Sequence, residues 1–234
     1  VWVRGDYYIS GATISRFFAL HVVALPLILI ALVFMHLVAL HEVGAGNPEG
    51  IDIEKHVDED GVPLDSVPFF PYKVLNALVG IGVFMIVFSI IMFFFPEMGG
   101  YFLEKANFEE ANPLSTPEHI APVWYYSPYY AMLRAVPDKL GGLIVMAGAI
   151  AILFVVPWLD RSKVASIRYK GIFSKIALVL FATSFITLGY LGTVPVTESR
   201  KLMSVIGTII YFGFFFLMPF YTSLEKTSVP PERL

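Results

Sequence analysis

Two histidines, His21 and His36, lie within the first long apolar stretch of the chain. They are 15 residues apart, which corresponds to about 22 Å along an α-helix. Fifteen steps of about 100° end about 60° past a full turn. Both imidazoles therefore project from roughly the same side of the predicted helix, at two different depths.

Ionisable side chains inside a membrane are functional candidates by default. A pair this far apart cannot bind one metal ion together, but each imidazole could supply one axial ligand to a separate haem iron. Two other readings are open: histidines that pack between helices, each hydrogen-bonded to a neighbour, and a polytopic transporter in which they relay protons. The remaining histidines, His41, His56 and His119, lie in loops, so a second ligand for each haem must come from outside this chain.

The composition indicates that lipid surrounds the elements that hold these histidines. Hydrophobic residues make up 57% of the 234 residues, charged residues make up 15%, and the mean hydropathy is +0.72. Five stretches have about the 20 apolar residues that a spanning helix needs, and backbone groups in hydrocarbon must bond internally. We predict an all-α, polytopic membrane helix bundle. Its predicted spans are residues 17–40, 74–95, 140–159, 172–191 and 202–220.

Charge and cysteine content exclude several classes of function. The net charge of −3 gives no basis for binding nucleic acid. The absence of cysteine excludes disulfides, iron–sulfur clusters and covalently attached haem within this chain. Four cations in the loop at residues 160–171 place that loop and the carboxyl-terminal tail on the cytoplasmic or matrix side. The loops at residues 96–139 and 192–199 then face the opposite, outer side.

Several segments, taken in order, resemble the cytochrome b family over the whole chain. They include the haem-bearing fourth helix of the family and a variant of its Pro-Glu-Trp-Tyr motif for quinol oxidation. The matching segments are Arg16 to His21, Met35 to Glu42, Gly46 to Ile51, Asn112 to Ile120, Pro122 to Tyr125, Tyr129 to Arg134 and Pro137 to Gly142.

The resemblance implies a chain that starts just before the fourth of eight family helices, so five of the eight helices are expected here. Residues 1–72 would form the haem-ligating helix with its flanking segments. Residues 73–234 would form a four-helix membrane domain with the quinol-oxidation loop at residues 96–139. The helix with the second axial ligands lies outside this chain, and this fragment alone is not expected to be active.

The family's reaction implies the cofactors, partners and location. Members of the family are the cytochrome b subunit of a quinol:cytochrome c reductase, and this complex oxidises quinol at an outer site. One electron goes to a Rieske iron–sulfur protein and the other passes through two b-type haems to an inner quinone-reduction site, with proton translocation. A membrane-anchored c-type cytochrome subunit, lipid and a second copy of the complex are further expected partners. A bacterial cytoplasmic membrane is expected in preference to the mitochondrial inner membrane.

The resemblance assigns His21 to the outer, low-potential haem and His36 to the inner, high-potential haem. Mitochondrial members carry these ligands about one residue closer together, and we expect the extra residue here to precede Pro26. Arg16 could pair with a haem propionate or could extend to the interface as a snorkelling cation.

The outer quinol site should involve Pro122, Val123, Trp124, Tyr125 and Tyr130. Val123 stands where the family usually has Glu, and valine cannot accept a proton. Glu118 is a weak candidate replacement, and a solvated loop carboxylate is the favoured interpretation of this residue.

The inner quinone site should include His41, which matches the family's quinone-contacting histidine and could otherwise be an ordinary residue at a helix C-terminus. Lys73 and Asn76 are further candidates there. The carboxylate that the family uses near this point is missing, because Ala77 follows Asn76.

Overall fold

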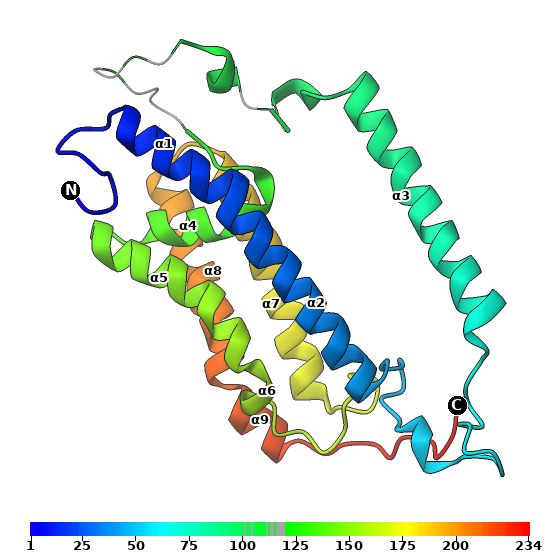
Figure 1. Cartoon of the computed structure of the whole chain (residues 1–234). Coiled ribbons are helices and arrows are strands. Elements are labelled where there is room, and N and C mark those ends of the chain that lie inside the picture. The colour runs from blue at the N-terminus through cyan, green and yellow to red at the C-terminus, as the bar shows by residue number, and fades with distance from the viewer. Residues whose placement is uncertain (101, 104, 111, 113–114, 116–119) are drawn as a thin grey trace. The chain divides into compact units, whose positions relative to one another are not determined.

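A computed structural model describes residues 1–100, 102–103, 105–110, 112, 115 and 120–234 of the chain (Figure 1). Within these residues the structure is helical without β-strands, apart from one isolated bridge between Val57 and Pro63. The chain divides into two compact units, Val1–Pro48 and Glu49–Leu234.

The first unit is built on one long apolar helical run, Gly11–Val43. It consists of α1 (Gly11–Ala19), a π-helical turn η1 (Leu20–Ala24) and α2 (Leu25–Val43). Its first turn is tied to the amino-terminal segment, because the hydroxyl of Thr13 donates to the carbonyl of Arg4 at 2.7 Å. The run ends at Gly44, whose φ of 78° requires a residue without a β-carbon.

The second unit contains the other four helices that are long and apolar enough to cross a membrane. These helices are α3 (Val74–Phe94), α5 with η7 and α6 (Lys139–Ala151, Ile152–Val155 and Val156–Leu159), α7 (Ile172–Thr193) and α8 (Glu198–Phe216). Shorter elements are η2 (Ile53–Lys55), η3 (Phe69–Lys73), η4 (Met98–Gly100), η5 (Lys105–Phe108), η6 (Trp124–Tyr126), α4 (Ser127–Ala135) and α9 (Met218–Leu224).

The five predicted spans are therefore confirmed, with one difference at the end of the fifth. We predicted that this helix continues to residue 220, whereas α8 ends at Phe216 and a separate helix, α9, starts at Met218. Pro219 explains the break, because it has no N–H to donate to the carbonyl four residues earlier, and its ring crowds that carbonyl.

The short helix α4 packs against α5, α7 and α8 (Figure 1). Two glycines permit this close packing. A β-carbon on Gly142 of α5 would lie 2.5 Å from the carbonyl oxygen of Leu133, and one on Gly192 of α7 would lie 2.1 Å from that of Ser127. Both distances are far below van der Waals contact, so the backbone of α4 lies directly against α5 and α7.

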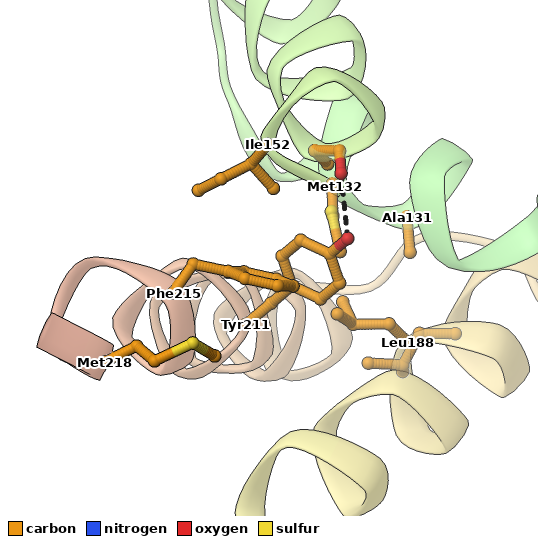
Figure 2. Close-up of a cluster of buried hydrophobic side chains, with 9 residues drawn as sticks. Ala131, Met132, Ile152, Leu188, Tyr211, Phe215 and Met218 are labelled. Atoms are coloured by element: carbon orange, nitrogen blue, oxygen red, sulfur yellow. Dashed lines mark hydrogen bonds between the residues drawn. The ribbon is translucent and has the colours of Figure 1, made fainter. Parts of the chain in front are cut away.

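A small buried core joins these four helices (Figure 2). Met132 of α4, Leu188 of α7 and Tyr211 of α8 are each at most 1% exposed. The hydroxyl of Tyr211 donates to the carbonyl oxygen of Ala149 on α5 at 2.8 Å, which satisfies the one polar group of this ring. The core therefore holds α4 at one end of the α5, α7 and α8 bundle.

Most apolar side chains elsewhere lie on the outside of the structure. Neither α2 nor α3 has a buried residue, and Phe34 and Ile86 are typical at 68% and 62% exposed. In water such a surface would be unfavourable over so many residues. These helices are therefore suited to lipid and to neighbouring membrane helices.

Candidate functional site

His21 lies in the π-helical turn η1, five residues before Pro26. The N–H of Leu25 donates to the carbonyl of Leu20, five residues back, instead of the usual four. Pro26 follows, and in a regular α-helix its ring would crowd the carbonyl of Val22. The wider turn accommodates one additional residue at this point.

This turn alters the angle between the two imidazoles. With one of the 15 residue steps from His21 to His36 absorbed by the π-turn, about 14 regular steps remain, and these end about 40° short of a full turn. His21 and His36 thus stay on one side of the run Gly11–Val43. The extra residue predicted to precede Pro26 has a structural counterpart in η1.

Both imidazoles are available to an external ligand. Each is exposed, and neither forms a hydrogen bond or ion pair with any residue that the structure describes. No group of three or more potential metal ligands occurs among those residues. Each imidazole can thus provide one axial ligand and leave the second to another polypeptide segment, and this donor set fits a haem better than a protein-caged metal ion.

Arg16 lies in α1, five residues before His21. Its guanidinium donates to the carbonyl of Trp2 at 2.8 Å. It also packs against Gly5, where a β-carbon would lie 2.7 Å from Nε of Arg16. The single carbonyl contact leaves several of the five guanidinium N–H groups open to a further anionic partner.

A separate cavity of about 630 Å³ lies beside η6, within the second unit. Its wall is largely aromatic and comes from η6, the first turn of α4 and one face of α7. The lining residues are Trp124, Tyr125, Pro128, Tyr129, Phe185, Ile186, Gly189, Tyr190 and Thr193.

Two of the residues predicted for the quinol site, Trp124 and Tyr125, line this cavity, and Val123 directly precedes η6. The ring of Tyr130 lies under the guanidinium of Arg134, 4.5 Å from its carbon. Glu118 lies outside the residues that the structure describes.

Sequence reasoning did not find the contributions of Tyr129, Phe185 and Tyr190. A signal was present, because residues 185, 186, 189, 190 and 193 follow the spacing of one helix face. Nothing in that spacing shows, however, that this face meets Trp124.

Arg134 fixes α4 to the carboxyl-terminal end of α7. Its guanidinium donates to the carbonyls of Leu191 at 2.5 Å and Val194 at 3.2 Å. A cation here complements the negative end of the helix dipole. Burial lowers the pKa of Arg134, but an arginine stays charged at neutral pH. The helix α4, whose first turn forms part of the cavity wall, is thus attached to α7 at both Gly192 and Arg134.

The residues predicted for the inner quinone site lie in both units. His41 is in the last turn of α2, Lys73 is in η3 and Asn76 is in the first turn of α3. All three side chains are exposed. Each one is therefore accessible to a ligand.

These features define a multi-pass membrane protein with two imidazoles at different depths of one helix. Comparison with known families agrees with this class. The family model described as cytochrome b(N-terminal)/b6/petB matches residues 1–128, and the one described as cytochrome b(C-terminal)/b6/petD matches residues 110–212. The chain belongs to the cytochrome b family.

Individual relatives extend over the whole chain. The cytochrome b of Allochromatium vinosum is 52% identical over 100% of this chain and 58% of its own length. The cytochrome b of Rickettsia bellii is 43% identical over 100% of this chain and 56% of its own length. The chain thus spans a little more than half the length of these relatives.

A solved structure described as a hyperthermophilic respiratory Complex III has a chain that superposes with a TM-score of 0.85. It is 36% identical, over 96% of this chain and 55% of that one. These similarities confirm the family inferred from the sequence motifs. They give no support to the alternative of a transporter.

The contact at Gly192 can be tested by adding a single methyl group. Gly192→Ala should displace α4 from α7 and lower stability by about 1–3 kcal/mol, the usual range for overpacking. Gly189→Ala is the matched control, because its β-carbon would meet Pro128 at an ordinary 3.6 Å. Thermal unfolding of the full-length protein in detergent measures the difference. Equal stability of the two variants would show that α4 does not lie against Gly192.

Proposed function

We propose that this chain is the carboxyl-terminal part of the cytochrome b subunit of a quinol:cytochrome c reductase, an enzyme complex that oxidises quinol and translocates protons. The observation that carries the proposal is the position of His21 and His36 on one side of a membrane-length helix. The name of the matching structure, a respiratory Complex III, supports the same assignment.

His21 and His36 would each hold one axial position of a b-type haem, with the other axial ligand outside this chain. By the positive-inside rule, His21 lies nearer the outer face and His36 nearer the inner face. The bound haems would supply reversible one-electron transfer. Arg16, close to His21, would orient the outer group through its open guanidinium N–H groups.

The cavity beside η6 would receive quinol at the outer side. Its volume of about 630 Å³ falls within the range of about 300–1,000 Å³ for small-molecule sites. Trp124 and Tyr125 supply flat apolar surface for a ring, and Tyr190 supplies a hydroxyl. Pro122 and Val123 directly precede these aromatic residues in the chain.

Proton release from quinol needs a group other than Val123. The hydroxyl of Tyr130 can donate or accept a hydrogen bond, and its ring lies 4.5 Å from the guanidinium carbon of Arg134. Glu118 is the remaining candidate for the base. Protons would leave to the outer side through such groups or through water.

At the inner side, His41 would contact quinone through its imidazole, which can donate or accept a hydrogen bond. Lys73 and Asn76 are proposed as additional polar contacts. Proposed partners are a Rieske iron–sulfur protein, a membrane-anchored c-type cytochrome, lipid and a second copy of the complex. Bacterial relatives such as those from Allochromatium vinosum and Rickettsia bellii favour a bacterial cytoplasmic membrane.

The assignment of His21 is tested in the full-length protein. His21→Ala should remove the low-potential b-haem component from the reduced-minus-oxidised spectrum and leave the high-potential component, because one axial ligand of the outer haem is lost. His56→Ala, in an exposed loop, is the control. An unchanged low-potential component in His21→Ala would refute the assignment.

The role of η1 is tested by deleting one residue within it and, separately, by inserting one residue after it. Deletion of Val23 should convert the π-turn to α-helix and retain both haems, because about 14 regular steps still separate the histidines. Insertion of an alanine after Val33 should rotate His36 by about 100° relative to His21. Pyridine haemochrome quantification should then find two haems after the deletion and fewer after the insertion. The reverse result would contradict the role of η1.

The cavity is tested with neighbouring aromatic residues. Trp124→Ala should lower the rate of quinol oxidation by about tenfold or more, because misplaced substrate slows the reaction steeply. Tyr126→Ala removes the next but one ring of η6, which does not line the cavity, and should have a much smaller effect. Pre-steady-state haem reduction by quinol, with the inner site inhibited, measures both rates. Equal losses of rate in the two variants would show that the cavity is not the quinol site.

A further inference from the structure

A second cavity, which is polar and has a volume of about 540 Å³, lies at the other end of the α5–α9 bundle and has no part in the proposed reaction. It lies between the loop after α6 and the segment after α9. Three of its lining residues are cations: Arg161 and Lys163 from the loop, and Lys226 from the segment.

None of these three cations has an ion-pair partner among the described residues, whereas cations nearby do. Arg168 pairs with Glu49, Lys170 pairs with Asp160, and Arg233 pairs with Asp65. Arg161, Lys163 and Lys226 form no ion pair with any residue in the described part of the chain. Three unpaired positive charges around one cavity indicate that an anion from outside the chain completes the site.

One carboxylate, Glu225, also lines the cavity, but it is already engaged. Its oxygens accept hydrogen bonds from the backbone N–H of Ser174 at 3.1 Å and from the hydroxyl of Ser174 at 2.6 Å. Ser174 belongs to the first turn of α7, where a carboxylate is favoured by the helix dipole. Two net positive charges therefore remain in the cavity.

The backbone around the cavity is held in place by hydrogen bonds between its two segments. The N–H of Arg161 donates to the buried hydroxyl of Thr222 on α9 at 3.0 Å, and the N–H of Ser228 donates to the carbonyl of Tyr169 at 2.8 Å. The loop and the tail thus approach each other before any ligand binds. Such preorganisation lowers the entropy that binding must overcome.

Apolar surface adjoins the cavity on the membrane side. Trp158 at the end of α6 is 75% exposed, and Phe220 and Leu224 of α9 are 64% and 80% exposed. Thr222 lines both this cavity and a neighbouring, largely apolar one of about 280 Å³. A ligand with a phosphate and hydrocarbon chains would match both surfaces, whereas inorganic phosphate would use only the cationic one.

We propose that Arg161, Lys163 and Lys226 bind the phosphate of an anionic phospholipid in the inner leaflet, with its acyl chains along α6 and α9. Basic pockets between helices on the cytoplasmic or matrix side are suited to such headgroups. The site is independent of the quinol chemistry. Each cation should strengthen binding about fivefold, given a contribution of about 1 kcal/mol per basic residue near the surface.

The test uses the complex purified with its full-length cytochrome b, stripped of lipid and placed in nanodiscs. One set of discs holds phosphatidylcholine alone, and another holds phosphatidylcholine with a minority of phosphatidylglycerol. Native mass spectrometry after release counts the phosphatidylglycerol molecules that remain bound. The variant is R161Q/K163Q/K226Q, and the matched control is K55Q/K175Q/K201Q, which removes the same charge away from the cavity.

The expected result is that R161Q/K163Q/K226Q retains one phosphatidylglycerol fewer per chain than the control, with haem content unchanged. Excess inorganic phosphate should not displace that lipid from the wild-type complex. Equal retention by the two variants would overturn the proposal. Full displacement by inorganic phosphate would also overturn it, because the site would then bind a free anion instead of a lipid.

Discussion

The structure depends above all on the register of one helix. A largely apolar helical run of 33 residues carries His21 and His36, and the angle between them is set by the backbone alone, since neither side chain has a partner among the described residues. The π-turn at Leu20–Ala24 adds a residue without turning the second imidazole away from the first. It also removes the crowding that Pro26 would impose on a regular turn. The π-turn therefore accommodates Pro26 and also keeps both imidazoles on the same side of the helix.

The second unit is organised around a different constraint, the close approach of α4 to its neighbours. Gly142 and Gly192 allow backbone contact on two sides, and Arg134 holds the carboxyl-terminal carbonyls of α7. With α4 fixed in this way, the rings of Trp124 and Tyr125 face one side of α7 and line the aromatic cavity. The core around Tyr211 includes Ala131 and Met132 of α4 and so helps to hold this helix in place (Figure 2). The shape of the proposed quinol site is thus a consequence of packing between helices, while its chemistry comes from the loop before α4.

Much of this could be predicted from the sequence, because hydropathy and residue spacing are local properties. The five spans and the shared side of His21 and His36 follow from apolar length and helical periodicity. The position of Tyr129 and Tyr190 in the cavity does not, because it depends on which helix faces which. An extra residue before Pro26 was suggested by comparison of the histidine spacing with the family, but its form as a π-turn could not be predicted, since an extra residue can be absorbed in several ways. The break at Leu217 could have been predicted from Pro219, which ends a helix by a known mechanism.

The central claim is that one helix supplies a ligand to each of two haems at different depths. A potentiometric titration of the full-length wild-type protein, followed at the α-band of reduced b-type haem, tests it most directly. The account predicts two one-electron components of similar amplitude at separate potentials, because the two haem environments differ in depth and surroundings. A single component, or no b-type haem signal in the purified protein, would contradict it.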